Sequence, residues 1–121
     1  MTKPLNILIA SGQDMFVKSL KYLFKRKGIQ CTIVNDGNSA IHALSNEKYD
    51  VLISDLLLSY KSGIEVTFFA KETINKPFCI IMTRIHADHF RKLAMEIGAD
   101  AYFKSPFDFE EIHDHIIKYV K

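Results

Sequence analysis

The sequence has 121 residues, of which 48% are apolar and 25% are charged, and this balance predicts one globular domain over residues 1–121. The formal net charge of +2 argues against a nucleic-acid-binding or membrane-binding surface, and no apolar run approaches the roughly 18 residues of a membrane span. The chain start lacks a signal-peptide pattern and two cysteines are too few for a disulfide framework, so we expect a cytoplasmic protein with free thiols.

Five short apolar segments recur along the chain, and each is followed by a segment with helical spacing. The middle segments are apolar at successive rather than alternate positions. That pattern is typical of strands buried on both faces of a parallel sheet. The five predicted strands are residues 5–10, 30–34, 50–55, 78–83 and 101–103.

Apolar residues at helical spacing follow each predicted strand in turn. Gly28 and Gly98 end the first and fourth predicted helices, and the turn at residues 35–37 precedes the second. Asp108, with Glu111 three residues later, resembles a capping box before the fifth. The apolar stripes are Phe16, Val17, Leu20, Leu23 and Phe24; Ala40, Ile41 and Leu44; Val66, Phe69 and Ala70; Phe90, Leu93, Ala94 and Ile97; and Phe109, Ile112, Ile116 and Val120.

Together these elements predict an α/β fold of the (βα)5 type, with a doubly wound five-stranded parallel sheet between helices. In such folds ligands bind beyond the carboxyl ends of the strands. The sequence has neither GxGxxG after its first strand nor a GxxxxGK[ST] motif, so dinucleotide and P-loop chemistry are not expected. The residues that this edge collects are Ser11, Gly12, Asp55, Thr83, Arg84, Lys104 and Ser105.

Three residue types at this edge suit the handling of a phosphoryl group. Asp55 closes the third strand, Thr83 closes the fourth, and Lys104 follows the fifth. A carboxylate can accept the phosphoryl group, a hydroxyl can bind its oxygens, and a cation can neutralise its charge. The pattern therefore indicates phosphoryl chemistry centred on Asp55.

Essentially the whole chain resembles the receiver domain of bacterial response regulators, the family of the single-domain chemotaxis response regulator. The resemblance implies a flavodoxin-like fold with strand order 2-1-3-4-5. It also implies a phosphoacceptor at Asp55, a switch threonine at Thr83 and a switch aromatic residue at Tyr102. The matching features are the first-strand run, NDG before the second helix, YDVLISDLLL, Gly63, Thr83, Gly98-Ala99, Tyr102 and Pro106-Phe107.

The chain departs from the family at the end of the first strand. Receivers carry two acidic residues there that hold Mg²⁺, but this chain has Ser11 and Gly12. Mg²⁺ usually needs one or two carboxylates, so we expect no cofactor or metal, and Mg²⁺ only weakly if at all. Asp14 is expected to cap the first helix rather than to reach the metal position.

Two basic residues also depart from the family pattern. The family lysine directly precedes the proline, where this chain has Ser105, and the lysine is one place earlier at Lys104. A shift of one residue turns a strand side chain to the opposite face, so Lys104 either points to solvent or reaches back around the strand end. Arg84 replaces a small residue after Thr83, and either pairs with Asp55 in place of the metal or points to solvent.

The sequence therefore favours a pseudo-receiver in two-component signal transduction, with impaired Mg²⁺-dependent phosphorylation. One alternative is a working phosphoacceptor, in which Asp55 takes phosphate from a histidine kinase. A weaker alternative is a small-ligand binder of the flavodoxin type. None of these readings makes the chain an enzyme.

The expected partners are proteins, because the family meets them through the fourth helix, fifth strand and fifth helix. A histidine kinase or an output domain is a candidate, and a homodimer is left open. Candidate contacts on this face are His89, Lys92, Tyr102 and His113. The five histidines show no metal-ligand spacing, and neither nucleic acid nor membrane is expected as a partner of this domain.

Overall fold

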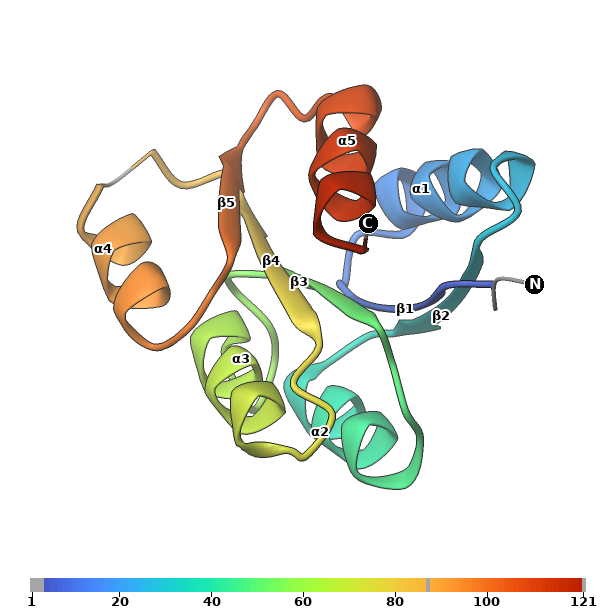
Figure 1. Ribbon diagram of the computed structural model, residues 1–121. Helices are drawn as coiled ribbons and strands as arrows, with labels where there is room; N and C mark the ends of the chain where they lie inside the picture. The colour runs from blue at the N-terminus through green and yellow to red at the C-terminus, as the bar shows by residue number, and fades with distance from the viewer. Residues whose placement is uncertain (1–3, 87, 121) are drawn as a thin grey trace.

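The structure, a computed structural model, describes residues 4–86 and 88–120. Strands and helices alternate along the chain (Figure 1). The elements are β1 (Asn6–Ala10), α1 (Asp14–Arg26), β2 (Gln30–Val34), α2 (Gly37–Asn46), β3 (Val51–Asp55), α3 (Gly63–Glu72), β4 (Phe78–Thr83), α4 (Asp88–Glu96), β5 (Ala101–Lys104) and α5 (Phe109–Val120).

The five strands form one parallel sheet in the order β2-β1-β3-β4-β5. This confirms the predicted (βα)5 architecture and strand order. Parallel pairing brings all carboxyl ends to one edge, with Ala10 opposite Ser54 and Asp55 opposite Met82. Thr83 pairs in turn with Lys104 at the end of β5. The polar residues that follow these strands therefore gather at that edge.

Helices cover both faces of the sheet, with α1 and α5 on one side and α2, α3 and α4 on the other (Figure 1). Neighbouring strand residues supply opposite cores, because side chains alternate along a strand. In β3, Val51 and Ile53 pack with the core under α1 and α5, whereas Leu52 packs with the core under α2 and α3. This two-sided burial explains why the strands are apolar at successive positions.

Several helix ends in the structure coincide with the capping and glycine signals of the sequence. Asp36 caps α2 by accepting a hydrogen bond from the Ser39 amide at 2.7 Å. Gly28 and Gly98 follow α1 and α4 with φ of 78° and 115°, a region that glycine enters without a steric penalty.

Two expectations about helices differ from the structure. The Asp108 carboxylate accepts from the Glu110 amide at 3.0 Å, so it caps α5 through the second helical residue rather than through Glu111. Leu93, predicted as core, is 45% exposed. Because α4 packs against the edge strand β5, it buries only a narrow stripe around Ala94.

None of the helices within residues 4–86 and 88–120 combines the length and the apolarity that a membrane crossing requires.

Candidate functional site

A pocket of about 210 Å³ lies at the carboxyl edge of the sheet. Asp55 and Thr83 line it from the ends of β3 and β4, the two strands that pair at the centre of the sheet. Its walls are largely apolar and come from α1, the loop after β3, the segment after β4 and the segment before α5. The full lining is Gln13, Phe16, Asp55, Leu56, Leu57, Met82, Thr83, Arg84, Ile85 and Phe107.

Ser11 binds directly to Asp55. Its hydroxyl donates to Oδ2 of Asp55 at 2.5 Å, the short range of hydrogen bonds to an ionised acceptor. The same hydroxyl oxygen accepts from the Gln13 amide at 3.1 Å, and Ser11 is fully buried. Ser11 therefore links the carboxyl group of Asp55 by hydrogen bonds to the loop between β1 and α1.

The environment of Asp55 raises the pKa of its carboxyl group. Burial is the largest cause, because it penalises the charged form. Three weaker influences act in the opposite direction: the Ser11 hydrogen bond, the positive charge of Arg84 and the Gly12 backbone amide. Asp55 thus accepts hydrogen bonds and lies in the field of a nearby positive charge, but its position is poorly solvated.

Thr83 and Tyr102 are both buried, at 5% and 6% exposure. Thr83 lines the pocket, and its hydroxyl group accepts from the Ile85 amide at 2.9 Å. The Tyr102 ring packs beneath α4 with Ala94 and Ala99. Its hydroxyl group has no hydrogen-bond partner within the part of the chain that the structure describes. Burial raises the pKa of this hydroxyl.

Arg84 crosses the mouth of the pocket. Its Nε donates to Oε1 of Gln13 at 3.0 Å, and its guanidinium carbon lies 5.8 Å from the centre of the Phe107 ring. Arg84 forms no direct ion pair with Asp55 among the described side chains. Of the two orientations left open for Arg84, the pairing with Asp55 is not observed. The exposed guanidinium group contacts neutral groups instead, and its positive charge acts on Asp55 without a direct contact. Sequence reasoning missed Gln13, because loop positions carry no periodic signal.

Lys104 and Ser105 do not bring a cation to Asp55. Lys104 Nζ lies 3.5 Å from Oδ1 of Asp88, at the start of α4. The Ser105 amide donates to the Thr83 carbonyl oxygen at 2.9 Å, and its hydroxyl lies 3.4 Å from Nε2 of His86. Of the two orientations considered for Lys104, the structure places it away from the pocket.

The described residues do not fit a Mg²⁺ ion in this pocket. Asp55 is the sole carboxylate among the described lining residues, and one of its oxygens is engaged by Ser11. Gly12 offers no side chain, and Arg84 adds positive charge nearby. Gln13, not Asp14, occupies the N-cap position of α1, and the Asp14 side chain lies outside the described residues. Mg²⁺ favours several oxygen ligands with one or two carboxylates, and this set offers too few.

A glycine holds the loop after β3 against the site. The Gly63 amide donates to the Leu56 carbonyl oxygen at 2.8 Å. A Cβ atom at Gly63 would lie 2.0 Å from the Asp55 carbonyl oxygen. The backbone that presents Asp55 therefore requires glycine at the start of α3.

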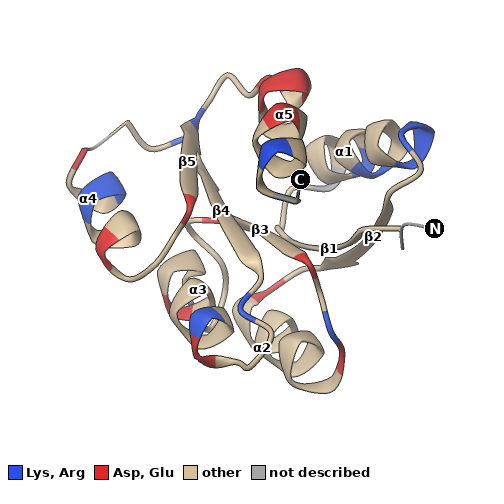
Figure 2. Ribbon diagram, viewed as in Figure 1, with Lys and Arg blue, Asp and Glu red and all other residues tan. Residues whose placement is uncertain are grey.

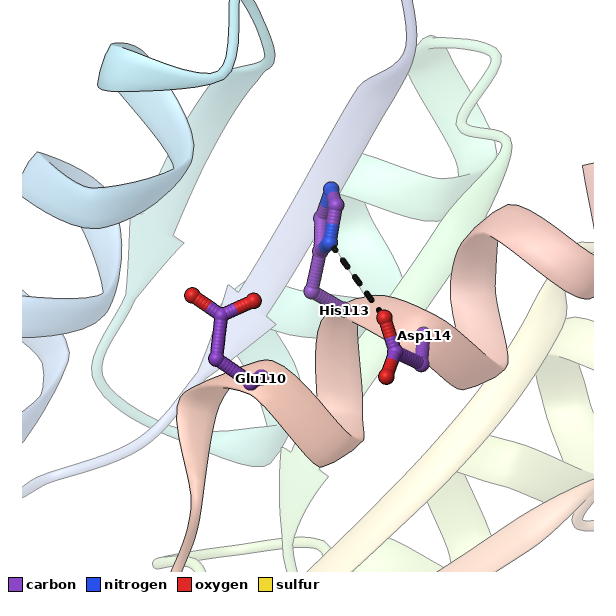
Figure 3. A group of neighbouring side chains, drawn as sticks. All are labelled: Glu110, His113 and Asp114. Atoms are coloured by element: carbon purple, nitrogen blue, oxygen red, sulfur yellow. Dashed lines mark ion pairs between the residues drawn. The ribbon is translucent and has the colours of Figure 1, made fainter.

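A second group of polar side chains lies on α5 (Figure 3). Candidate ligand atoms of Glu110, His113 and Asp114 all lie within 4.8 Å of one another. Ligands of a tetrahedral zinc ion, each about 2.0–2.2 Å from the metal, are roughly 3.5 Å apart. Two of the three residues are exposed, and Nδ1 of His113 lies 4.0 Å from Oδ1 of Asp114, which is wider than this spacing. We therefore assign no metal to this group.

Comparison with known sequences gives one consistent family. Residues 7–117 match the family model of the response regulator receiver domain. The alkaline phosphatase synthesis transcriptional regulatory protein PhoP of Bacillus subtilis is 30% identical over 111 residues, which are 91% of this chain and 46% of PhoP. Response regulator ArlR of Staphylococcus epidermidis is 28% identical over 108 residues, 88% of this chain and 48% of ArlR. The chain thus spans about half the length of these relatives.

Solved structures show the same fold. A CheY-like response regulator receiver domain protein of Methanospirillum hungatei superposes with a TM-score of 0.91 at 19% identity, covering 98% of this chain and 94% of that one. The receiver domain of the sensor histidine kinase PA1611 of Pseudomonas aeruginosa, with a magnesium ion coordinated in its active-site cleft, gives a TM-score of 0.86 at 19% identity, with 98% of each chain covered.

Proposed function

The chain belongs to the response regulator receiver domain family, and on that premise we propose that it is a pseudo-receiver. In this proposal the domain acts in a two-component system by binding another protein, without Mg²⁺-dependent phosphorylation of Asp55. It catalyses no reaction, holds no cofactor and works in the cytoplasm.

The observation that carries the proposal is the hydrogen bond of 2.5 Å from Ser11 to Asp55. Phosphoryl transfer depends almost entirely on positioning and on neutralising charge. Here the metal ligands of the first strand are replaced by a hydroxyl and a glycine, and Lys104 is paired with Asp88 instead. Asp55 and Thr83 remain in place, but the described pocket has neither a second carboxylate to hold Mg²⁺ nor a lysine beside Asp55.

A working phosphoacceptor at Asp55 is the second candidate. Asp55 and Thr83 both line the pocket, and a working phosphoacceptor would use the carboxylate of one and the hydroxyl of the other. A receiver domain of the same fold holds magnesium in its cleft. Under this candidate, Mg²⁺ would bind through Asp55, waters and backbone oxygens with low affinity.

The partner surface in this proposal is the face formed by α4, β5 and α5. His89 and Lys92 are exposed on α4, next to the exposed Leu93. Tyr102 is buried beneath this face, and His113 stacks on Phe109 with ring centres 5.7 Å apart. Contacts are therefore expected through α4 rather than through Tyr102. A histidine kinase, an output domain and a second copy of the chain all remain candidates.

Basic and acidic residues gather at different ends of the neighbouring helices α1 and α5 (Figure 2). Lysine and arginine gather toward the end of α1, with Lys25 and Arg26 in its last turn, whereas Glu110 and Glu111 lie in the first turn of α5. A partner of either sign has a complementary surface on this domain, so charge alone does not select the partner.

An NMR titration with Mg²⁺, followed by beryllofluoride as a mimic of the aspartyl phosphate, tests the proposal. We expect no saturable shifts at Asp55, Thr83 or Tyr102 at millimolar Mg²⁺. The matched control is Gly12→Asp, since a Cβ atom at Gly12 meets nothing closer than the Asn35 carbonyl oxygen at 3.8 Å. This variant supplies a second carboxylate, so we expect it to bind Mg²⁺ more tightly than the natural chain.

Saturable shifts at Asp55 and Thr83 in the natural chain, strengthened by beryllofluoride, would reject the pseudo-receiver and establish the phosphoacceptor. Binding by Gly12→Asp alone would support the proposal, because it would show that the missing carboxylate is what disables the site.

A further inference from the structure

The pocket around Asp55 has the lining of a small-molecule site rather than that of a metal site. Phe16 and Phe107 line one wall, with ring centres 5.0 Å apart at an angle of 41°. Leu57 and Ile85 add apolar surface from two other segments. Binding sites for small molecules are typically apolar with a few placed polar groups, and this pocket has that composition.

Its size limits the occupant. The volume of about 210 Å³ is below the roughly 300–1,000 Å³ of sites for drug-sized ligands. The two phenylalanine rings are in contact with each other, so a ligand lies against them rather than between them. An aromatic ligand of one or two rings matches this space and this wall, because tilted aromatic pairs are favourable.

The pocket lining holds one acidic and one basic residue, and the exposed basic one favours an anion. Arg84 is exposed at the mouth, and Gln13 and Phe107, which are both neutral, hold its guanidinium group. A guanidinium group binds a carboxylate with two parallel hydrogen bonds. The carboxyl group of Asp55 lies deeper and is bound by Ser11, so it is poorly placed to receive an amine, and Arg84 would repel one.

We propose that this pocket binds a small aromatic carboxylate, with its ring against Phe16 and Phe107 and its carboxylate on Arg84. The ligand would contact Thr83 and Ile85, which begin the segment that leads to α4. Occupancy would therefore adjust the partner surface without phosphorylation. This inference goes beyond the proposed function, and it needs neither a kinase nor Mg²⁺.

The test is an NMR titration of the chain in Mg²⁺-free buffer with phenylacetate, with phenylacetamide, acetate and inorganic phosphate as matched probes. We expect saturable shifts at Phe16, Arg84, Ile85 and Phe107 with phenylacetate. Phenylacetamide should bind at least about tenfold more weakly, since it loses the charged hydrogen bonds. Acetate should give no saturable shifts, because it lacks the ring.

Two variants distinguish binding of phenylacetate in this pocket from nonspecific attraction of the anion to positive charge. Arg84→Met keeps the length of the side chain and removes its charge, so phenylacetate should bind about tenfold more weakly. Lys104→Met is the control, because Lys104 is exposed and does not line the pocket, and it should leave the affinity unchanged. The amide spectrum of each variant reports whether the fold is intact.

Three outcomes would overturn the inference: no saturable shift at concentrations on the order of 10 mM, equal binding of phenylacetate and inorganic phosphate, or shifts that gather on the lysines of α1. Each of these would leave the proposed function untouched, because that proposal is tested by Mg²⁺ and beryllofluoride. Saturation by Mg²⁺ would conversely reject the pseudo-receiver without deciding whether phenylacetate binds.

Discussion

At the scale of single residues, Ser11 determines how one oxygen of the Asp55 carboxyl group is bound. The register that pairs Ala10 with Ser54 places the next residue of each segment, Ser11 and Asp55, side by side. The sequence alone shows that an acidic position has become a hydroxyl. It does not show that this hydroxyl donates to Asp55, because that contact depends on the pairing of strands 44 residues apart. The replacement therefore exchanges a metal ligand for a hydrogen-bond donor.

The titration of Asp55 gives a prediction about stability. Burial raises the pKa of this carboxyl group above its ordinary value of 3.8. Between that value and the higher pKa of the folded state, the folded protein retains a proton that the unfolded chain releases. Stability therefore falls as pH rises through this window, and above it the folded state carries the full penalty.

Asp55→Asn removes this penalty and keeps an acceptor oxygen for Ser11. We expect the variant to be more stable than the natural chain at pH 7. Its advantage should shrink as the pH falls through the window toward 3.8. Urea unfolding of both proteins at several pH values measures the difference directly. An advantage that stays constant with pH would contradict a titrating Asp55 as its cause.

At the scale of elements, the loop between β3 and α3 positions the site. Its backbone is closed by hydrogen bonds from Gly63 to Leu56 and from Gly37 to Ser59, at 2.8 and 3.0 Å. It ends in a capping box, in which Ser62 and Glu65 each bind the other's backbone amide. The S-x-x-E spacing of this box is a sequence signal for the start of α3 that sequence reasoning missed.

Substitutions at two glycines distinguish a steric requirement for glycine from the general effect of reducing backbone flexibility. Gly63→Ala places a Cβ atom 2.0 Å from the Asp55 carbonyl oxygen, so we expect a loss of about 3 kcal/mol or more in the free energy of unfolding. Gly12→Ala has its nearest contact at 3.8 Å, and we expect a change within about 1 kcal/mol. Urea unfolding compares the two, and equal losses would contradict the steric account of Gly63.

Lys104 and Arg84 show which side-chain orientations the alternation along a strand determines and which it does not. Lys104 lies in β5, and alternation along the strand turns it to the side where it meets Asp88 of α4. Arg84 lies beyond the end of β4, where no periodicity fixes a side chain. Its orientation depends on Gln13 and Phe107, from two distant segments. The sequence therefore left both orientations of Arg84 open.

At the scale of the whole molecule, the fold was predictable because independent local signals agree. Apolar strands, helical stripes and the Gly28 and Gly98 helix ends all indicate the same alternation of elements. The apolar wall of the pocket was not predictable in this way. Phe16, Leu57 and Phe107 read as separate residues in the sequence, and only the assembled sheet edge brings them together.

The reactivity of the two cysteine thiols reports local opening of the sheet. Cys79 is fully buried in β4 and Cys31 is partly buried in the edge strand β2. Burial raises the pKa of each thiol to about 12, so little reactive thiolate forms near neutral pH. An edge strand opens more easily than a central one. We therefore expect Cys31 to be modified before Cys79.

Labelling with a disulfide reagent measures this order, with Cys79→Ala reporting on Cys31 and Cys31→Ala reporting on Cys79. We expect Cys79 to react at least about a hundredfold more slowly in the folded chain than in urea, because access requires opening of the sheet centre. Equal rates for the two thiols would show that the sheet opens as one unit. A faster Cys31 would show that the edge strand β2 opens more readily than the interior strand β4.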